Sequence, residues 1–155
     1  MTDAKFNSAL AIIYDLLHPV SNNWFIIGTS SLYLMGYAVV PNDVDILAPA
    51  DEADLISVAL NDYSIKHSTL PNNKFKSLFN KYLINGVLVE VMCGLEVNTK
   101  QGWMLLQDQI KQPEIVEVNG QAFTVPGKAD QINIYNLFNR PKDNAVLAML
   151  KNEHY

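Results

Sequence analysis

Cysteine, positive charge and long apolar runs are all scarce in this chain. Cys93 is the single cysteine in 155 residues, which excludes an internal disulfide and a zinc site built from cysteines. Only 11 lysines and arginines stand against 16 aspartates and glutamates, so the net charge is −5. Because proteins that grip nucleic acid normally present a basic face, a long RNA or DNA substrate is disfavoured.

The hydrophobic residues are distributed as in a globular domain rather than a membrane protein. No apolar stretch reaches the length of a membrane span, and no basic region precedes an apolar run near the N-terminus. We therefore expect no transmembrane helix and no signal peptide, and a reducing cytoplasm fits the single cysteine. Hydrophobic residues make up 49% of the chain, which argues against disorder. Residues 1–155 contain no linker or repeat and are predicted to form a single domain.

Alternating helix and strand patterns predict an α/β (α+β) fold, in which a mixed β-sheet is flanked by helices and the C-terminus is helical. Hydrophobic spacing predicts helices over 4–17, 30–35, 51–60, 100–110, 128–138 and 143–150. Apolar runs predict strands over 24–27, 44–47, 79–84, 87–92, 115–118 and 122–125, with an edge strand over 63–67. Tight hairpins are predicted at Asn85-Gly86 and Asn119-Gly120, and a turn or mobile loop over 70–73.

The most informative motif is a small turn followed by a pair of aspartates. A predicted strand ends at Gly28, Thr29 and Ser30, which form a hydroxyl-rich turn into a short helix. Asp43 and Asp45 then alternate with apolar residues, so in a strand both carboxylates project from the same face. Such a pair is costly to bury unless a cation lies between its members, and hard oxygen ligands suit Mg²⁺ or Mn²⁺. The turn would then be the phosphate end of the same site.

Each half of this motif alone has a commoner explanation. An Asp-Val-Asp triplet is usually a strand end or a solvated edge, and a Gly-Thr-Ser turn is usually a plain helix N-cap. The order and separation of the two halves favour a functional site.

A third carboxylate interrupts a predicted apolar strand. Glu90 is the only charged residue in the run over 87–92, which is typical of a central strand buried on both faces. An acid in such a strand must be neutral, paired or metal-bound, whereas an exposed strand face would accommodate it without a partner. Because two aspartates precede it, we favour Glu90 as the third carboxylate of the site.

These residues resemble the signature of the nucleotidyltransferase superfamily of the DNA polymerase β type. That signature is an apolar residue, Gly, and Gly or Ser, then a spacer, then Asp, an apolar residue, and Asp or Glu. Ile27-Gly28-Thr29 and Asp43-Val44-Asp45-Ile46 match it, with Thr29 where Gly or Ser is usual. The superfamily also has a third carboxylate on a later strand, commonly Asp, where this chain has Glu90.

The resemblance implies transfer of a nucleoside monophosphate from a nucleoside triphosphate to a hydroxyl group of an acceptor. Asp43, Asp45 and Glu90 would then be the catalytic and metal-binding residues, with Mg²⁺ or Mn²⁺ as cofactor. The residues expected at the nucleotide's phosphates are Gly28, Thr29, Ser30, Lys128, Arg140 and Lys142.

The C-terminal end of the chain extends the resemblance. Small relatives commonly close a helix with Arg, a variable residue, Lys and Asp, and the segment over 140–143 matches this order. Its basic residues would face phosphates, and Asp143 is expected to cap the last helix. A helix–helix connection with solvated charges explains the same segment equally well.

Three departures from the family pattern reduce the positive charge or alter the closing motif. No basic residue precedes the aspartate pair over 38–41, Tyr135 stands where Lys is common, and Asn144 follows where an acid is common. Lys74 or Lys76 would have to supply charge from elsewhere, as would Lys128.

Two functions from other classes stay open. A non-catalytic module with this fold would be an antitoxin-like or regulatory protein partner, and a nucleotide sensor would bind the metal without turnover. The three carboxylates favour catalysis, and the missing basic residues favour the module. We expect a nucleoside triphosphate and an acceptor that the fold does not identify, with a protein partner or a homodimer also open.

Overall fold

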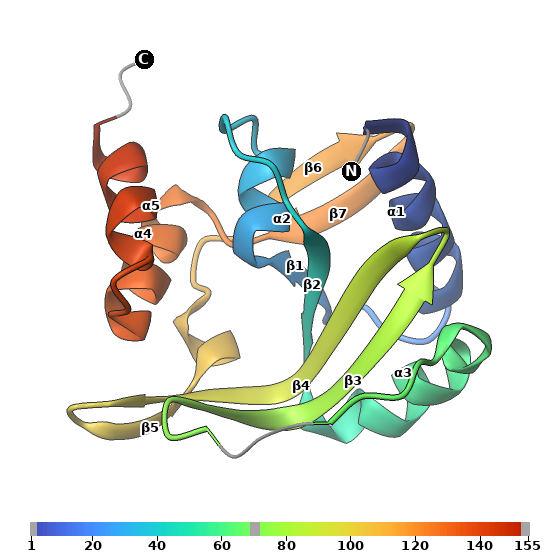
Figure 1. The fold of residues 1–155 in the computed structure, drawn as a ribbon, viewed down its shortest axis with the longest axis horizontal. Coiled ribbons are helices and arrows are strands. Elements are labelled where there is room, and N and C mark those ends of the chain that lie inside the picture. The colour runs from blue at the N-terminus through green and yellow to red at the C-terminus, as the bar shows by residue number, and fades with distance from the viewer. Residues whose placement is uncertain (1–2, 69–71, 153–155) are drawn as a thin grey trace.

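The computed structural model describes residues 3–68 and 72–152 of the chain. Within these residues a five-stranded sheet and a separate two-stranded sheet are surrounded by helices (Figure 1). The predicted mixed α+β fold with a helical C-terminus is confirmed. No helix of the described part combines the length and apolar character needed to cross a bilayer.

Helices and strands alternate along the chain. The helices are α1 (Asp3–Leu17), α2 (Gly28–Leu34), α3 (Ala53–Ala59), α4 (Lys128–Phe138) and α5 (Asp143–Lys151), with the 3-10 turns η1 (Ala50–Glu52), η2 (Asn61–Tyr63) and η3 (Leu106–Gln109). The strands are β1 (Phe25–Ile27), β2 (Asp43–Ala48), β3 (Phe75–Ile84), β4 (Val87–Thr99), β5 (Gly102–Leu105), β6 (Glu114–Val118) and β7 (Gln121–Val125).

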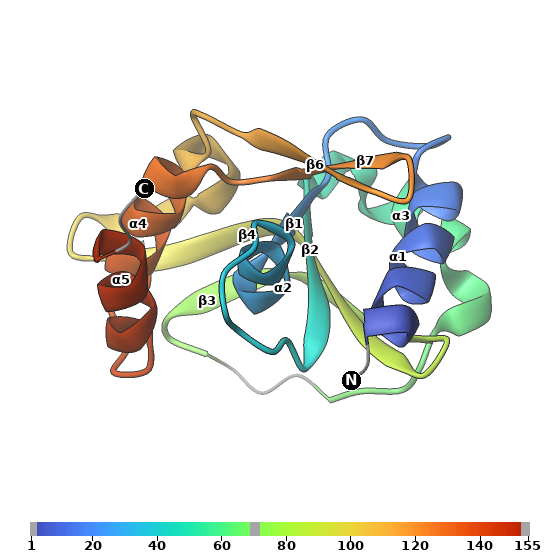
Figure 2. The same cartoon turned by 90° about the horizontal axis from the view of Figure 1, so that it is seen from above.

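The main sheet is mixed, as predicted. Its order is β1-β2-β4-β3, and β5 pairs with the far end of β4. β2 and β4 run parallel, whereas β1–β2, β3–β4 and β4–β5 are antiparallel. Strands β6 and β7 form their own antiparallel hairpin, which packs beside β1 (Figure 2).

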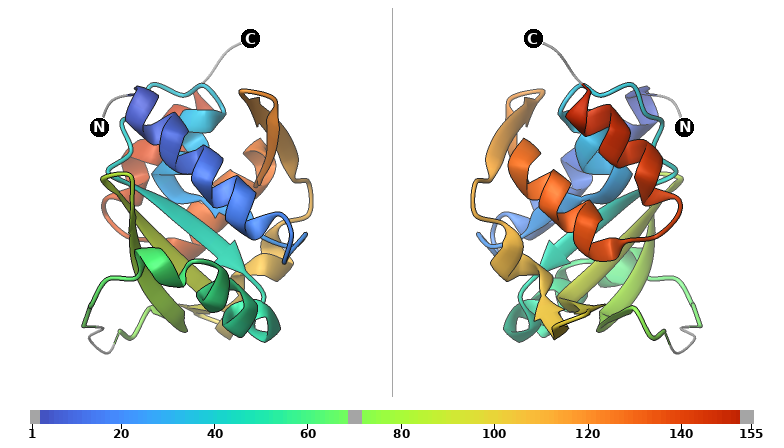
Figure 3. Two further views of the ribbon diagram at one scale, coloured as in Figure 1. Left: turned by 90° about the vertical axis from the view of Figure 1, so that its right-hand side faces the viewer. Right: turned by 90° about the vertical axis from the view of Figure 1, so that its left-hand side faces the viewer.

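Two apolar clusters hold the helices to the sheet. In the first, Leu10 of α1 and Ile56 of α3 pack with the strand residues Val44 and Val89. The second surrounds Leu106 of η3 and includes residues of α2, α4 and α5. α1 therefore lies at one end of the molecule and the α4–α5 pair at the other (Figures 1 and 3).

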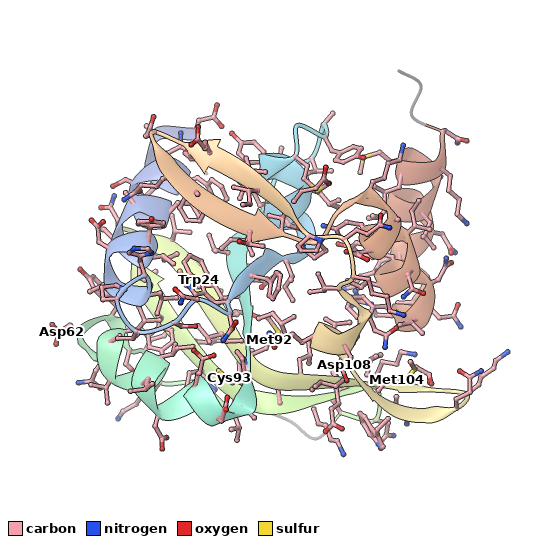
Figure 4. The ribbon with its side chains drawn as sticks, turned by 180° about the vertical axis from the view of Figure 1, so that it is seen from behind. Trp24, Asp62, Met92, Cys93, Met104 and Asp108 are labelled. Atoms are coloured by element: carbon pink, nitrogen blue, oxygen red, sulfur yellow. The ribbon has the colours of Figure 1, made fainter. Side chains whose placement is uncertain are left out.

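β4 divides its side chains between the two clusters. Val89, Val91 and Cys93 are buried in the first cluster, whereas Met92 packs against the second and Glu90 is half-buried. Met92 and Cys93, labelled in Figure 4, are successive residues, and side chains alternate across a strand. The prediction that this strand is buried on both faces is therefore wrong, because one face is fully buried and the other is only half-buried. Burial raises the pKa of the Cys93 thiol to about 11, as befits a core cysteine.

The helix predicted over 100–110 is wrong. β4 continues to Thr99, and β5 folds back along it through a tight turn. The Thr99 hydroxyl donates to the carbonyl of Gly102 at 2.9 Å and accepts from the amide of Gln101 at 3.1 Å. Gly102 has a φ of +98°, which L side chains rarely adopt, so this glycine favours a turn over a helix.

Smaller differences concern the middle of the chain. The predicted edge strand over 63–67 is reduced to one bridge between Ser64 and Tyr82, and the helix predicted over 51–60 begins as the separate turn η1. Residues 70 and 71 of the turn predicted over 70–73 lie outside the described residues. The other predicted helices and strands are confirmed close to their expected bounds, although the first hairpin is longer than predicted.

Candidate active site

A cleft of about 980 Å³ opens between the half-buried face of the main sheet and the α4–α5 pair. This volume is at the upper end of the range for small-molecule sites. The sheet contributes the carboxylates Asp43, Asp45 and Glu90 together with the aromatic rings of Phe75 and Phe79. The start of α2 and residues of α4 and α5 complete the lining.

Three carboxylates meet on the sheet side of this cleft. Asp43 and Asp45 alternate with the buried Val44 on β2, and the parallel register sets Glu90 of β4 directly opposite Asp45. One oxygen from each of the three carboxylates lies within 4.8 Å of the others. The predicted arrangement, with two acids on one strand and the third on its neighbour, is confirmed; their roles stay predictions.

Burial raises the pKa of each carboxylate, and the charges of neighbouring carboxylates raise those of Asp45 and Glu90 further. The pKa of Asp45 rises from 3.8 to about 8, first because burial penalises the charged form and then because Asp43 and Glu90 lie beside it. Burial is also the largest cause of the raised pKa of Asp43 and of Glu90. Three crowded carboxylate oxygens are the hard donor set that Mg²⁺ and Mn²⁺ prefer, and a divalent cation would relieve their repulsion. The cluster therefore fits a divalent metal.

The turn between β1 and α2 positions Asp45. β1 ends at Ile27, as the sequence predicts, and α2 begins at Gly28, two residues before its predicted start. Gly28 has a φ of +64°, and a Cβ there would lie only 2.5 Å from Oδ2 of Asp45. The Ser30 hydroxyl donates to the carbonyl of Ile27 at 2.7 Å and accepts from the amide of Asp45 at 3.2 Å. Asp45 therefore explains both residues: a side chain at position 28 would collide with its carboxylate, and the Ser30 hydroxyl accepts a hydrogen bond from its amide.

Of the three turn residues predicted at the phosphates, two line the cleft. Gly28 and Thr29 do so, but Ser30 is only 1% exposed and its hydroxyl is bonded within the protein. The next hydroxyl, of Ser31, also points inward. It donates to the carbonyl of Gly28 at 2.7 Å and accepts from the side-chain Nε2 of Gln131 at 2.9 Å. Ser30 therefore holds Asp45 and the end of β1 in place and does not itself face the cleft.

The predicted basic residues divide in the same way. Arg140 and Lys142, in the α4–α5 connection, line the cleft, and their positive charges lower the pKa of Asp45. Lys128 begins α4 and lines a separate shallow hollow beside Glu114. The structure thus brings two of the three predicted cations to the carboxylates.

Arg140 is held by Asp143 on one side and by aromatic rings on the other. Its Nε and Nη2 atoms donate to the two carboxylate oxygens of Asp143 at 2.8 and 2.9 Å, and its amide donates at 3.0 Å. The guanidinium lies 5.2 Å from the ring centre of Phe75 and 4.9 Å from that of Phe138. Asp143 is the first residue of α5 rather than its N-cap, so the predicted capping role is wrong.

Sequence reasoning missed a lysine beside the cluster. Lys81 of β3 is the register partner of Glu90, and its ammonium lies 3.9 Å from the Glu90 carboxylate. The signal was present in the sequence. Counting outward from the tight turn at Asn85-Gly86 pairs these two residues directly.

No protein-family model and no curated protein matches this sequence. The structure, in contrast, matches solved structures over nearly its whole length.

One similar structure is TM1012 from Thermotoga maritima, a proposed nucleotidyltransferase. It is 26% identical, with a TM-score of 0.79, and the match covers 99% of this chain and 97% of that one. The lincosamide antibiotic adenylyltransferase LnuA, solved with lincomycin, is 14% identical, with coverages of 98% and 98% and a TM-score of 0.63. ANT(2″)-Ia, solved in complex with adenylyl-2″-tobramycin, is 9% identical, with coverages of 94% and 86% and a TM-score of 0.57.

These matches confirm the class predicted from the motif. The chain has the nucleotidyltransferase fold and belongs to that fold superfamily. The similarity to TM1012 extends over nearly the whole of both chains, and more than a quarter of the residues are identical.

Proposed function

We propose that this chain is a metal-dependent nucleotidyltransferase that moves a nucleoside monophosphate from a nucleoside triphosphate to a hydroxyl group of a small acceptor. The observation that carries the proposal is the cluster of Asp43, Asp45 and Glu90, whose oxygens lie within 4.8 Å of one another in a cleft of this fold. A cluster with a pKa raised to about 8 in a cleft marks a functional site more often than a structural one.

The three carboxylates would hold Mg²⁺ or Mn²⁺ at the sheet end of the cleft. The bound metal would neutralise triphosphate charge and stabilise the charge that develops on the leaving pyrophosphate. Gly28 and Thr29, at the start of α2, would offer backbone amides to the phosphates, and Lys142 would add a positive charge. Glu90 would help to bind a second metal ion, or would accept the proton of the acceptor hydroxyl as its oxygen attacks the α-phosphorus and pyrophosphate leaves.

The acceptor is proposed to be a small molecule. The net charge of −5 disfavours a long nucleic acid, and a cleft of about 980 Å³ has room for a nucleotide beside a compact acceptor. LnuA has been solved with lincomycin and ANT(2″)-Ia with adenylyl-2″-tobramycin, so proteins of this fold accept antibiotics. A hydroxylated compound of that size is the acceptor class that we propose.

A second candidate is a non-catalytic module that binds a protein partner. The observation in its favour is that three cations near the cluster are already paired with acids. Arg140 bonds Asp143, and the other two pairs are Lys76 with Glu96 at 3.5 Å and Lys81 with Glu90 at 3.9 Å. Weak binding of a triphosphate would follow if none of these pairs opened.

Calorimetry separates the two candidates. Mn²⁺ alone, and each of the four common nucleoside triphosphates with Mg²⁺, would be titrated into the intact protein and into Asp45→Asn. Asp108→Asn, on the η3 turn, serves as the matched control. An enzyme should bind Mn²⁺ and at least one Mg²⁺–triphosphate, and Asp45→Asn should abolish both while the control does not.

An activity assay then tests turnover. Release of pyrophosphate from the bound triphosphate would be followed with a panel of hydroxylated antibiotics and sugars. Release that depends on both the acceptor and Asp45 supports the enzyme. An intact protein that binds no triphosphate would leave the partner module as the better account.

A further inference from the structure

Tyr135 is a buried residue whose hydroxyl group has no assigned task. It lies on α4, is 5% exposed and lines the cleft that holds the carboxylates. Its ring packs edge-on against Phe138, with the two centres 5.7 Å apart. Within residues 3–68 and 72–152, no group accepts or donates a hydrogen bond at its phenol oxygen. That oxygen is not sealed from solvent, so it borders the open space of the cleft.

Packing alone does not explain this hydroxyl. The ring belongs to the second apolar cluster, and a phenylalanine would fill the same space without a polar group. With no partner in the protein, this hydroxyl is left to bond water or a ligand in the cleft. An unsatisfied donor at the edge of a binding cleft is therefore expected to receive its partner from the ligand.

The surroundings of Tyr135 make its hydroxyl a donor rather than a base. Burial, and then the negative charges of Asp143 and Asp45, raise its pKa to about 12. The phenol therefore keeps its proton at neutral pH. Neither carboxylate is its hydrogen-bond partner, so its proton is available to an oxygen that a ligand brings into the cleft.

The cations of the site indicate what kind of ligand oxygen accepts the proton of Tyr135. Arg140, which lowers the pKa of Tyr135 and so lies near it, shares its bidentate bonds with Asp143. A negatively charged ligand entering here meets few cations that lack an acid partner, and neutral donors must supply part of its hydrogen bonding. A phenol beside the metal-binding carboxylates is suited to that task, because hydrogen bonds to charged oxygens are the stronger ones.

We propose that Tyr135 donates a hydrogen bond to a phosphate oxygen of the bound nucleoside triphosphate. This inference rests on the proposed function and adds a binding residue to it. It assigns the recognition of phosphate, at least in part, to a neutral side chain on α4.

The test is Tyr135→Phe, which removes only the hydroxyl. Binding of the Mg²⁺ complex of the best-bound nucleoside triphosphate, and of Mg²⁺–tripolyphosphate, would be measured by calorimetry. Loss of one hydrogen bond to a charged oxygen should weaken both about tenfold to a hundredfold. Mn²⁺ alone should bind as before, because the three carboxylates are intact, and the melting temperature should not fall.

Tyr82→Phe is the matched control. Tyr82 is equally buried, at 2% exposed, but it belongs to the α1 cluster and its hydroxyl bonds Ser57 instead of facing the cleft. This variant is expected to lose stability and to keep the affinity for triphosphate.

Each other outcome has a distinct meaning. If the intact protein binds Mg²⁺–triphosphate and Tyr135→Phe binds it equally well, the role of Tyr135 is refuted and the proposed function stands. If Tyr135→Phe loses Mn²⁺ as well, the hydroxyl acts through the carboxylates and the inference is wrong. If nucleotide binding weakens but tripolyphosphate binding does not, the hydroxyl contacts another part of the nucleotide and the inference is equally wrong. An intact protein that binds no triphosphate removes both proposals together.

Discussion

The charge of Asp45 is costly to the metal-free protein, so Asp45→Asn tests the site directly. Its pKa is 3.8 ordinarily and about 8 in the folded protein. Below pH 3.8 the folded and the unfolded protein both hold the proton, and the carboxyl does not reduce the free energy of unfolding. As the pH rises towards 8, the unfolded chain releases the proton and the folded protein does not, so the free energy of unfolding falls. Above pH 8 the loss is complete and constant.

The size of the effect follows from the shift. At 1.36 kcal/mol for each pKa unit, the upper limit is about 6 kcal/mol above pH 8. Water enters an open cleft and reduces such penalties, so we expect Asp45→Asn to stabilise the metal-free protein by about 2–4 kcal/mol at pH 8. At pH 4 the variant and the intact protein should be nearly equal.

Urea denaturation in the presence of a chelator, at intervals from pH 4 to pH 9, gives the free energy of unfolding for both proteins. Glu117→Gln, an exposed acid on β6, is the control and should not reproduce the pH dependence. Saturating Mg²⁺ should remove most of this difference, because a metal at one hundred times its dissociation constant stabilises the intact protein by about 2.7 kcal/mol and the variant by little. A variant that is no more stable than the intact protein at pH 8 would refute the reasoning.

Four further variants test the parts around the cluster. Gly28→Ala should weaken Mn²⁺ binding at least tenfold in calorimetry, because the new Cβ would lie 2.5 Å from Oδ2 of Asp45. Ser30→Ala should cost about 1–2 kcal/mol in urea denaturation, because the amide of Asp45 loses its acceptor. Arg140→Ala should cost about 2–3 kcal/mol, because the buried Asp143 loses a partner that is itself 31% exposed. Lys142→Ala should keep its stability and bind Mg²⁺–triphosphate about tenfold more weakly.

Each of these predictions is contradicted by a specific result. Normal metal binding by Gly28→Ala would show that the carboxylate can move away without loss. Unchanged stability of Ser30→Ala would assign the amide another acceptor. Arg140→Ala with full stability and weak triphosphate binding would mean that Arg140 leaves Asp143 to meet the phosphates, as the sequence alone implied. Full affinity of Lys142→Ala would exclude this lysine from the phosphate site.

The carboxylate cluster was predictable because its determinants are local. Alternation along one strand sets Asp43 and Asp45 on the same face, and a single charged residue in an apolar run points to Glu90. The hairpin turn also contains the register that pairs Lys81 with Glu90. What the sequence leaves open is which strands neighbour each other, and the parallel pairing of β2 with β4 comes from tertiary structure.

The errors have a common physical origin. They lie where the sequence pattern is compatible with more than one structure and the backbone conformation decides between them. The spacing of apolar residues from Trp103 to Leu106 suits a helix as well as a strand, and the turn at Gly102 settles it as β5. At the α4–α5 connection, Asn139 adopts a left-handed conformation with φ +50°. Three donors of Arg140 then reach Asp143, and composition alone does not contain that geometry.

Charge balance links the acidic chain to an anionic substrate. The cluster of Asp43, Asp45 and Glu90 carries a carboxylate whose pKa is raised to about 8, so without a cation the cluster is electrostatically strained. A triphosphate entering alone would add negative charge beside it, among cations that are mostly paired with acids. Under the proposed function, metal and triphosphate would each lower the cost of binding the other, because the metal would offset the negative charge of both the carboxylates and the phosphates. Under the proposed function, a protein of net charge −5 therefore depends on the divalent cation for nucleotide affinity as well as for chemistry.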